Sequence, residues 1–181
     1  MEPKFCHRCG NALVKRVVDD GHTRPVCSAC GHIFYLNPPI AAGVIVERED
    51  GKIVLVLRGE NPGKGLWCLP AGFMEIDETL EQAAQRECRE ETGLIVTTDD
   101  LVGVWSYFHR EKGTAGVLVV YTAHIVGGEV RPGSDSVDVR FFAPEEIPEE
   151  QLAFWTHRAA LARWRSNAYR TAIRARVTPT P

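Results

Sequence analysis

The chain has 181 residues, a formal net charge of −3, and a composition of 44% hydrophobic and 25% charged residues, which is typical of a soluble globular protein with one main core and a small extra module. The small net charge argues against a nucleic-acid partner, and no apolar run approaches the roughly 18 residues that a membrane-spanning helix needs. The N-terminal stretch MEPKFCHRCG has no apolar signal region, so we expect a cytoplasmic protein.

Four cysteines come first along the chain, paired as Cys6-x2-Cys9 and Cys27-x2-Cys30. The 17 residues between the pairs (10–26) match the spacing of a zinc ribbon, and each pair is followed by glycine, which tolerates a left-handed turn. In a reducing compartment such pairs more often bind metal than form disulfides. We expect residues 1–36 to fold around Zn²⁺ held by the four thiolates; two disulfides or four free thiols are the alternatives.

The remainder, residues 37–181, is predicted to be a second domain in which strands precede, surround and follow a helix. Apolar, β-branched runs predict the strands, and an acidic helix ends at Gly93, a residue typical of the position just after a helix. This order indicates an α/β protein with a mixed sheet and not a doubly wound one. The expected strands are 40–48, 52–58, 101–109, 115–126 and 137–143, and the expected helices are 79–92 and an arginine-rich one at about 156–175.

Three carboxylates, Glu87, Glu90 and Glu91, cluster near the end of the acidic helix. On a wheel of about 100° per residue they continue the apolar stripe that contains Leu80 and Ala83. A carboxylate cluster on a core-facing stripe is costly unless a cation compensates it, and converging oxygen ligands suit Mg²⁺ or Mn²⁺. The pattern therefore suggests a metal site that handles phosphates; an ordinary solvated helix face is the alternative.

The stretch GFMEIDETLEQAAQRECREETGL (72–94) resembles the signature box of the Nudix hydrolases. All the fixed positions of that box are present, and Cys88 and Leu94 occupy variable apolar positions. With its N-terminal cysteines and the stretches NPPIAAGVIV and FFAPEEIPEEQLAF, the chain is similar to the zinc-ribbon members, namely bacterial and plant ADP-ribose/FAD pyrophosphatases and, less closely, NADH pyrophosphatases. The resemblance implies a Nudix-type α/β/α sandwich with a mixed β-sheet, preceded by the ribbon.

The resemblance also implies roles for residues in and near the box. Glu87, Glu90 and Glu91 would bind catalytic Mg²⁺ or Mn²⁺, and one of them would activate the attacking water. The backbone carbonyl of Ala71 would be a further metal ligand. The residues expected to brace the loop–helix–loop are Gly72, Glu78, Arg86 and Gly93, with Arg86 in an ion pair.

Residues outside the box are candidates for substrate contacts. Arg58 opens the glycine-rich loop and is placed to meet a phosphate, and Trp105 and Tyr107 alternate on one strand, where family members stack a base. Asp138, with Asp135 nearby, is a candidate for the extra acidic ligand or base that the family often places on a later loop. A solvent-exposed arginine and ordinary loop acids are the alternatives.

The function implied is divalent-metal-dependent hydrolysis of the diphosphate linkage in ADP-ribose, FAD or a related dinucleotide, by attack of water on phosphorus. The motif Ser-Gln-Pro-Trp-Pro-Phe-Pro of NADH pyrophosphatases is absent, because TTDDLVGVWSYFHREKG follows the box. We expect a small-molecule nucleotide substrate, no membrane or nucleic-acid partner, and leave a homodimer open. A nucleotide-sensing regulatory module and the sanitation of nucleoside triphosphates are the alternative functions.

Overall fold

The computed structural model describes residues 3–109, 113–133 and 135–166. These residues fall into two compact units. The first contains the residues up to Pro38 together with the described residues of 109–114, and the second contains residues 39–108 and the described residues from Ala115 onward. Within the described ranges no helix is long and apolar enough to cross a membrane.

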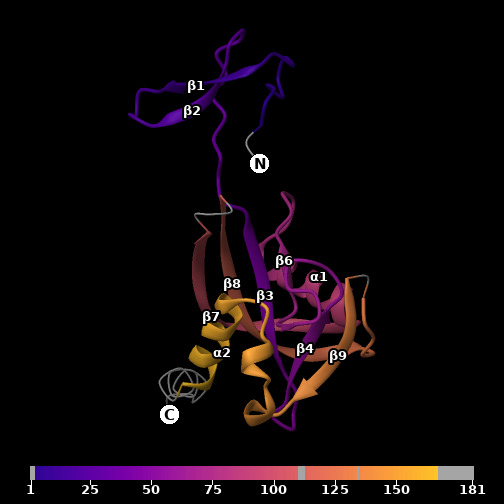
Figure 1. Cartoon of the computed structure of the whole chain (residues 1–181). Helices are drawn as coiled ribbons and strands as arrows, with labels where there is room; N and C mark the ends of the chain where they lie inside the picture. The colour runs from indigo at the N-terminus through magenta and orange to yellow at the C-terminus, as the bar shows by residue number, and fades with distance from the viewer. Residues whose placement is uncertain (1–2, 110–112, 134, 167–181) are drawn as a thin grey trace, which may run out of the picture. The chain divides into compact units, whose positions relative to one another are not determined.

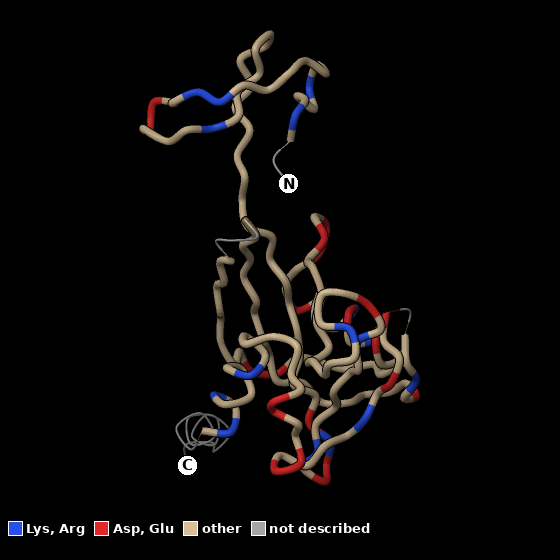
Figure 2. The backbone as a smooth tube through the Cα atoms, in the orientation of Figure 1, with Lys and Arg blue, Asp and Glu red and all other residues tan. Residues whose placement is uncertain are grey.

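The N-terminal unit is built on a two-stranded antiparallel hairpin, β1 (Leu13–Val17) and β2 (Thr23–Cys27), in which Leu13 lies opposite Cys27 (Figure 1). Basic residues lie on both strands and acidic residues lie at the turn between them (Figure 2). Gly10 and Gly31, which follow the two cysteine pairs, have φ angles of 73° and 71°. Glycine is favoured at both positions because side chains disfavour this left-handed conformation.

The second unit is a seven-stranded mixed sheet in which β3 is central. β3 pairs in parallel with β8 but antiparallel with β4 and β6, and the order is β5-β4-β3-β8-β7, with β9 also paired to β4. The strands are β3 (Ile40–Glu47), β4 (Ile53–Arg58), β5 (Trp67–Cys68), β6 (Ala71–Phe73), β7 (Leu94–His109), β8 (Thr114–Gly128) and β9 (Ser136–Phe142).

One helix covers each face of this sheet (Figure 1). α1 (Leu80–Thr92) begins at Thr79, which forms a capping box with Gln82, and ends at Gly93 with φ 75°. It packs on Val44 and Val46, whereas α2 (Trp155–Arg165) packs on the opposite face, where Ile45 points. Successive side chains of β3 point to opposite faces of the sheet and so contribute to two cores, one under each helix. The predicted α/β/α sandwich with a mixed sheet is confirmed. Two short 3₁₀ helices, Pro144–Glu146 and Glu149–Gln151, precede α2.

Three elements differ from the prediction. The expected glycine-rich loop contains β5 and β6, and the strand expected at 101–109 begins at Leu94, directly after the helix. The last helix ends at Arg165, because Ser166 is extended and both its N–H and its Oγ–H donate to the carbonyl of Arg163. The rest of the helix predicted to reach residue 175 lies outside the described residues.

Candidate active site

The last two turns of α1 and the short strand β6 bring two of the predicted carboxylates against the sheet. Glu91 is only 3% exposed, and its Oε2 accepts a 3.0 Å hydrogen bond from the backbone N–H of Ala71. Glu87 faces Gly72 so closely that a Cβ atom at Gly72 would overlap the carboxylate. β6 is fixed in this position by its pairing with β3, where Gly72 lies opposite Ala42. Position 72 therefore requires glycine, because the backbone itself forms the wall of the site.

The environment of this pair disfavours negative charge. Burial raises the pKa of Glu91 to about 8, and the charges of Asp135 and Glu87 act in the same direction, against the Ala71 N–H and the Arg58 charge. Burial also raises the pKa of Glu87. Ionised carboxylates are costly in a region of low dielectric constant, so a cation bound here would stabilise both of them. The oxygen ligands fit a hard divalent ion.

Arg86 holds the acidic side chains at the edge of this site. Its guanidinium donates to Glu78 at 2.7 and 3.0 Å, to Glu87 at 2.7 Å, to Glu90 at 3.3 Å and to the carbonyl of Phe73 at 2.9 Å. The bond from Arg86 lowers the pKa of Glu78 to about 2. One guanidinium shared among three carboxylates leaves the cluster short of positive charge.

Glu90 differs from its two neighbours because its side chain is 57% exposed, whereas that of Glu87 is 15% exposed. The helical wheel predicted that all three glutamates lie on the buried stripe, which is wrong for Glu90. At about 60° from Glu87 on the wheel, it lies at the solvent edge of the face that α1 turns to the sheet. Within the part of the chain that the structure describes, the three carboxylates do not form a group as tight as the cysteine sulfurs, which lie within 4.8 Å of one another.

The segment between β5 and β6 is held from the side of α2. The backbone N–H of Leu69 donates a 3.0 Å hydrogen bond to Nδ1 of His157, and the N–H of Ala153 donates at 2.8 Å to the carbonyl of Trp67. Burial lowers the pKa of His157 to about 3, so the ring is neutral and Nδ1 acts as an acceptor. His157 of α2 thus contacts the backbone at Leu69, which is two residues before Ala71 in the chain.

His157 was not among the site residues predicted from the sequence. A signal existed, because His157 begins an i, i+3, i+4, i+7 pattern that indicates the buried face of a helix. The later members of that pattern are Ala160, Leu161 and Trp164, all of them buried. No comparable pattern marks Leu69, the partner of His157, which lies 88 residues earlier in the chain.

The segment between β8 and β9 closes the C-terminal end of α1. The carbonyl of Glu91 accepts hydrogen bonds from the N–H of Gly133 at 3.1 Å and from Oγ of Ser136 at 2.9 Å. Asp135 lies in the same segment, and its charge raises the pKa of both Glu87 and Glu91. Asp135 therefore adds negative charge to the surroundings of the two glutamates.

Asp138 takes a different position. It lies on β9 opposite Leu57 and forms a 2.6 Å ion pair with Arg140. Its neighbour Val139 packs in the core under α1, so the alternation of side chains along the strand turns Asp138 to the other face. Of the two aspartates predicted as candidates, Asp135 acts electrostatically on the glutamates, whereas Asp138 pairs with Arg140.

Arg58 is the last residue of β4 and acts electrostatically on the cluster. Its charge lowers the pKa of Glu91, its Nε donates at 2.7 Å to the carbonyl of Pro62, and its guanidinium lies 5.2 Å from the centre of the Phe154 ring. Arg58 thus has an electrostatic effect on the site and a fixed orientation.

Trp105 and Tyr107 are both partly buried and share one face of β7. The ring of Trp105 covers Gly103 and packs against the core under α2, and the ring of Tyr107 covers Gly116 of β8. Both rings therefore lie on the sheet face of α2, and the glutamates of α1 lie on the other. The described contacts do not bring these aromatic rings to the carboxylates.

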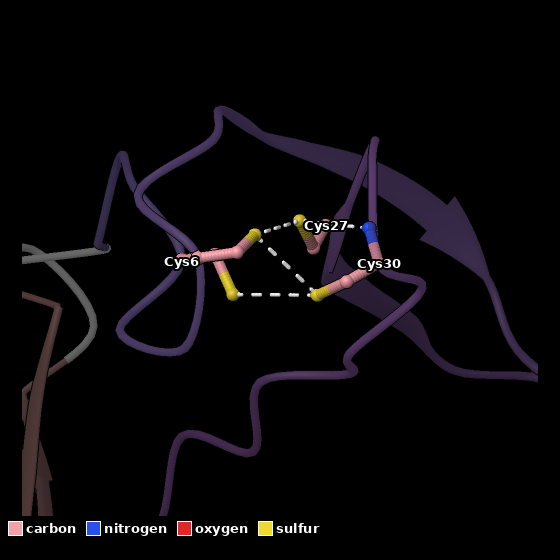
Figure 3. Close-up of side chains that lie close together, drawn as sticks. Cys6, Cys27 and Cys30 are labelled. Carbon is pink, nitrogen blue, oxygen red and sulfur yellow. Dashed lines mark hydrogen bonds between the residues drawn. The ribbon is translucent and has the colours of Figure 1, made fainter.

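The four cysteines of the N-terminal unit form a second site. Their sulfur atoms all lie within 4.8 Å of one another, with separations of 3.4 to 3.8 Å between Cys6 and Cys30, Cys9 and Cys27, and Cys9 and Cys30; three of these residues are labelled in Figure 3. A tetrahedral ion with metal–sulfur bonds of about 2.3 Å has edges of about 3.8 Å, so the thiols fit such an ion. Hydrogen bonds from Asn11 lower the pKa of Cys9 to about 6, which favours the thiolate.

Two family models match the sequence. One is described as the NUDIX domain and matches residues 37–164. The other is described as Nudix N-terminal and matches residues 4–36. The first contains the glutamate cluster and the second contains the four cysteines.

Individual proteins are also similar to the chain. An ADP-ribose pyrophosphatase of Methanocaldococcus jannaschii is 41% identical over 121 residues, which are 67% of this chain and 70% of that protein. The NAD-capped RNA hydrolase NudC of Pseudomonas aeruginosa is 30% identical over 80% of this chain, which spans only 49% of that protein. The crystal structure of a NUDIX hydrolase from Nitrosomonas europaea has a TM-score of 0.81 and 33% identity, and the match covers 98% of this chain and 96% of that one.

Proposed function

The chain belongs to the Nudix hydrolase family, and we propose that it hydrolyses the diphosphate linkage of a nucleoside diphosphate joined to a second moiety. ADP-ribose, FAD and related dinucleotides form the proposed substrate class. The relative named an ADP-ribose pyrophosphatase supports this class, because its similarity covers two thirds of each chain. The bond cleaved and the identity of the second moiety are what a substrate panel resolves.

The observation that carries the proposal is the pairing of Glu91 with the Ala71 N–H, beside a Glu87 carboxylate that packs on Gly72. Both carboxyls, the buried one of Glu91 and the half-buried one of Glu87, have raised pKa values, and a bound cation would stabilise their ionised forms. We propose that Glu87, Glu90 and Glu91 hold Mg²⁺ or Mn²⁺, with the carbonyl of Ala71 as a further ligand and Asp135 as an additional acidic group. A divalent ion there would screen the phosphate charge and lower the pKa of a bound water.

The remaining residues are given supporting roles. Arg86 keeps Glu87 in place and ties the helix to the preceding loop through Glu78. For Arg58 the proposed role is contact with a phosphate of the substrate. We propose Zn²⁺ as the ion of the four cysteines, because tetrathiolate ligation at this spacing is typical of structural zinc.

The test is a panel of substrates incubated with Mg²⁺ or Mn²⁺, with the products identified by mass. The panel contains ADP-ribose, FAD, NADH, an oligoribonucleotide with a 5′ NAD cap, and nucleoside triphosphates. We expect AMP and a second phosphate ester from ADP-ribose or FAD. No turnover of any compound by the wild type, or equal turnover by Glu91→Gln, would overturn the proposal. Binding without hydrolysis would instead favour a nucleotide sensor.

The NAD-capped oligoribonucleotide is included because of the similarity to the relatives named NAD-capped RNA hydrolase. Selective cleavage of that substrate over ADP-ribose would assign the chain to RNA decapping. Selective cleavage of the triphosphates would assign it to the sanitation of nucleotide pools.

A further inference from the structure

A depression of about 670 Å³ lies at the C-terminal end of α1, beside the glutamate cluster. This volume is within the range of about 300–1,000 Å³ found for small-molecule sites. Three of the side chains that line it are arginines. The lining residues are Arg86, Arg89, Glu90, Arg131, Pro132 and Gly133.

Within the described part of the chain, two of these three arginines have no acidic partner. Arg86 is committed to Glu78 and Glu87. In contrast, no carboxylate of residues 3–109, 113–133 and 135–166 lies within ion-pair distance of Arg89 or Arg131. The depression therefore contains two guanidinium groups whose charge the neighbouring side chains do not neutralise.

The backbone around Arg131 is well fixed. Its N–H donates at 2.9 Å to the carbonyl of Thr92, and its Cγ lies so near Gly93 that a Cβ atom there would stand 2.7 Å away. At Gly133 a Cβ atom would overlap the carbonyl oxygen of Glu90. The segment that carries Arg131 therefore packs tightly on the end of α1. This packing keeps Arg131 at the depression that Arg89 also lines.

The depression is also continuous with the glutamate cluster. Glu90 lines the depression and is the exposed member of the cluster. The segment that forms the opposite wall continues to Asp135, whose charge acts on Glu87 and Glu91. A substrate with its diphosphate at the cluster would thus have its adjoining part within reach of Arg89 and Arg131.

We propose that this depression is an anion subsite that binds a phosphate group carried by the substrate in addition to its scissile diphosphate. The proposal rests on the proposed function. Guanidinium groups present planar, paired donors that match phosphate oxygens, and they stay charged at any physiological pH. The ligand class is a dinucleotide with a phosphomonoester on one of its riboses.

If the two arginines had a purely structural role, the experiment would have a different outcome. Arg89 lies in the last turn of α1 and Arg131 is bonded to its end, so both charges also favour the negative end of the helix dipole. If that is their whole role, replacing them lowers the melting temperature and leaves the choice between substrates unaltered.

The experiment compares kcat/KM for ADP-ribose and for ADP-ribose phosphorylated on the 2′ or 3′ hydroxyl of the adenosine ribose or on the terminal ribose. The proteins are the wild type, Arg89→Gln, Arg131→Gln, the double variant, and Arg163→Gln on the exposed side of α2 as a control. We expect the wild type to prefer at least one phosphorylated form by about tenfold, the value of a good charge-assisted contact. The double variant should bring that ratio close to one, and Arg163→Gln should keep the wild-type ratio.

Equal kcat/KM values for all forms in the wild type, or a preference that survives in the double variant, would overturn the subsite. Failure of the proposed function is distinguishable, because in that case the wild type would hydrolyse neither form of the substrate. The conservative variants Arg89→Lys and Arg131→Lys keep the charge and lose the paired donors, so we expect an intermediate ratio.

Discussion

The Nδ1 atom of His157 on α2 accepts a 3.0 Å hydrogen bond from the backbone N–H of Leu69, two residues before the N–H of Ala71 that holds Glu91. The two helices cover opposite faces of the sheet. The short segment between them is therefore fixed by one side chain from each helix. We infer that His157 is a positioning residue for the cluster, acting through Leu69 and Ala71.

Replacing His157 should test that inference. His157→Leu leaves the buried N–H of Leu69 without an acceptor, so we expect a loss of about 1–3 kcal/mol in the free energy of unfolding and a weaker apparent affinity for Mg²⁺. His157→Asn keeps an acceptor close to the Nδ1 position and should recover most of both. Denaturant titrations and Mg²⁺ dependence of turnover measure the two effects. Equal Mg²⁺ affinity in His157→Leu and wild type would show that the contact serves stability alone.

The same histidine predicts how stability depends on pH. Burial lowers its pKa from 6.5 to about 3, so below pH 6.5 the unfolded chain takes up a proton that the folded chain refuses. The contribution of His157 to stability is complete above pH 6.5 and is lost as the pH falls toward 3, at up to about 1.4 kcal/mol per pH unit. Urea midpoints for wild type and His157→Asn across this range measure it. Parallel curves for the two proteins would contradict the assignment.

Gly72 should not tolerate even a methyl group. Its Cβ would overlap the Glu87 carboxylate, so Gly72→Ala should displace that carboxylate and lower kcat/KM on the order of 100-fold, as misplacement of a reacting group by about 1 Å does. Gly127→Ala on β8 is the matched control, because the nearest atom to its Cβ would be 3.8 Å away. Turnover and Mg²⁺ affinity of the two variants give the comparison. A fully active Gly72→Ala would place the reactive metal elsewhere.

Glu91→Gln should separate chemistry from folding. The amide oxygen of glutamine can still accept the Ala71 N–H, so the fold should be retained, whereas the charge that would hold a metal or activate water is lost. We expect turnover to fall by about 10²–10⁴-fold with a melting temperature equal to or above that of the wild type in the absence of metal. The activity assay and a thermal scan in EDTA measure these two outcomes. Loss of the folded state would show instead that Glu91 is needed for packing.

Removal of metal from the N-terminal unit should unfold that unit alone. Its hairpin has little core of its own, so bound Zn²⁺ would supply its stability. We expect about one zinc per chain in the purified protein, lost in Cys6→Ser but kept in the control Cys68→Ala, since Cys68 lies in the core under α1. Elemental analysis and limited proteolysis of residues 13–27 measure this. Full zinc content in Cys6→Ser would rule out the tetrathiolate site.

Several features followed from local pattern alone. The cysteine spacing predicted the sulfur cluster, because both pairs lie in tight turns that few residues determine. The acidic helix was predicted within one residue of its ends, since Thr79 caps its start and Gly93 its finish. The α/β class followed in the same way from the order of apolar runs.

The side-chain orientations at the site could not be obtained in this way. Glu90 points to solvent although the wheel placed it on the buried stripe, because the exact width of the contact between α1 and the sheet depends on the packing of both. Asp135 and Asp138 were both candidates in the sequence. The register of β9 on β4 sets Asp138 opposite Leu57, whereas Asp135 precedes that strand.

The sequence by itself determined the chemistry that the chain carries: four thiols at ribbon spacing and three glutamates on one helical turn. Short-range spacing is enough for this, because a turn or a helix fixes neighbours within a few residues. Only the tertiary structure decided how that chemistry is held. Three features depend on residues 42 to 88 positions apart: the bond from Leu69 to His157, the closure of α1 by Gly133, and the depression lined by Arg89 and Arg131. Such contacts follow from how the elements pack around β3, which no local pattern encodes.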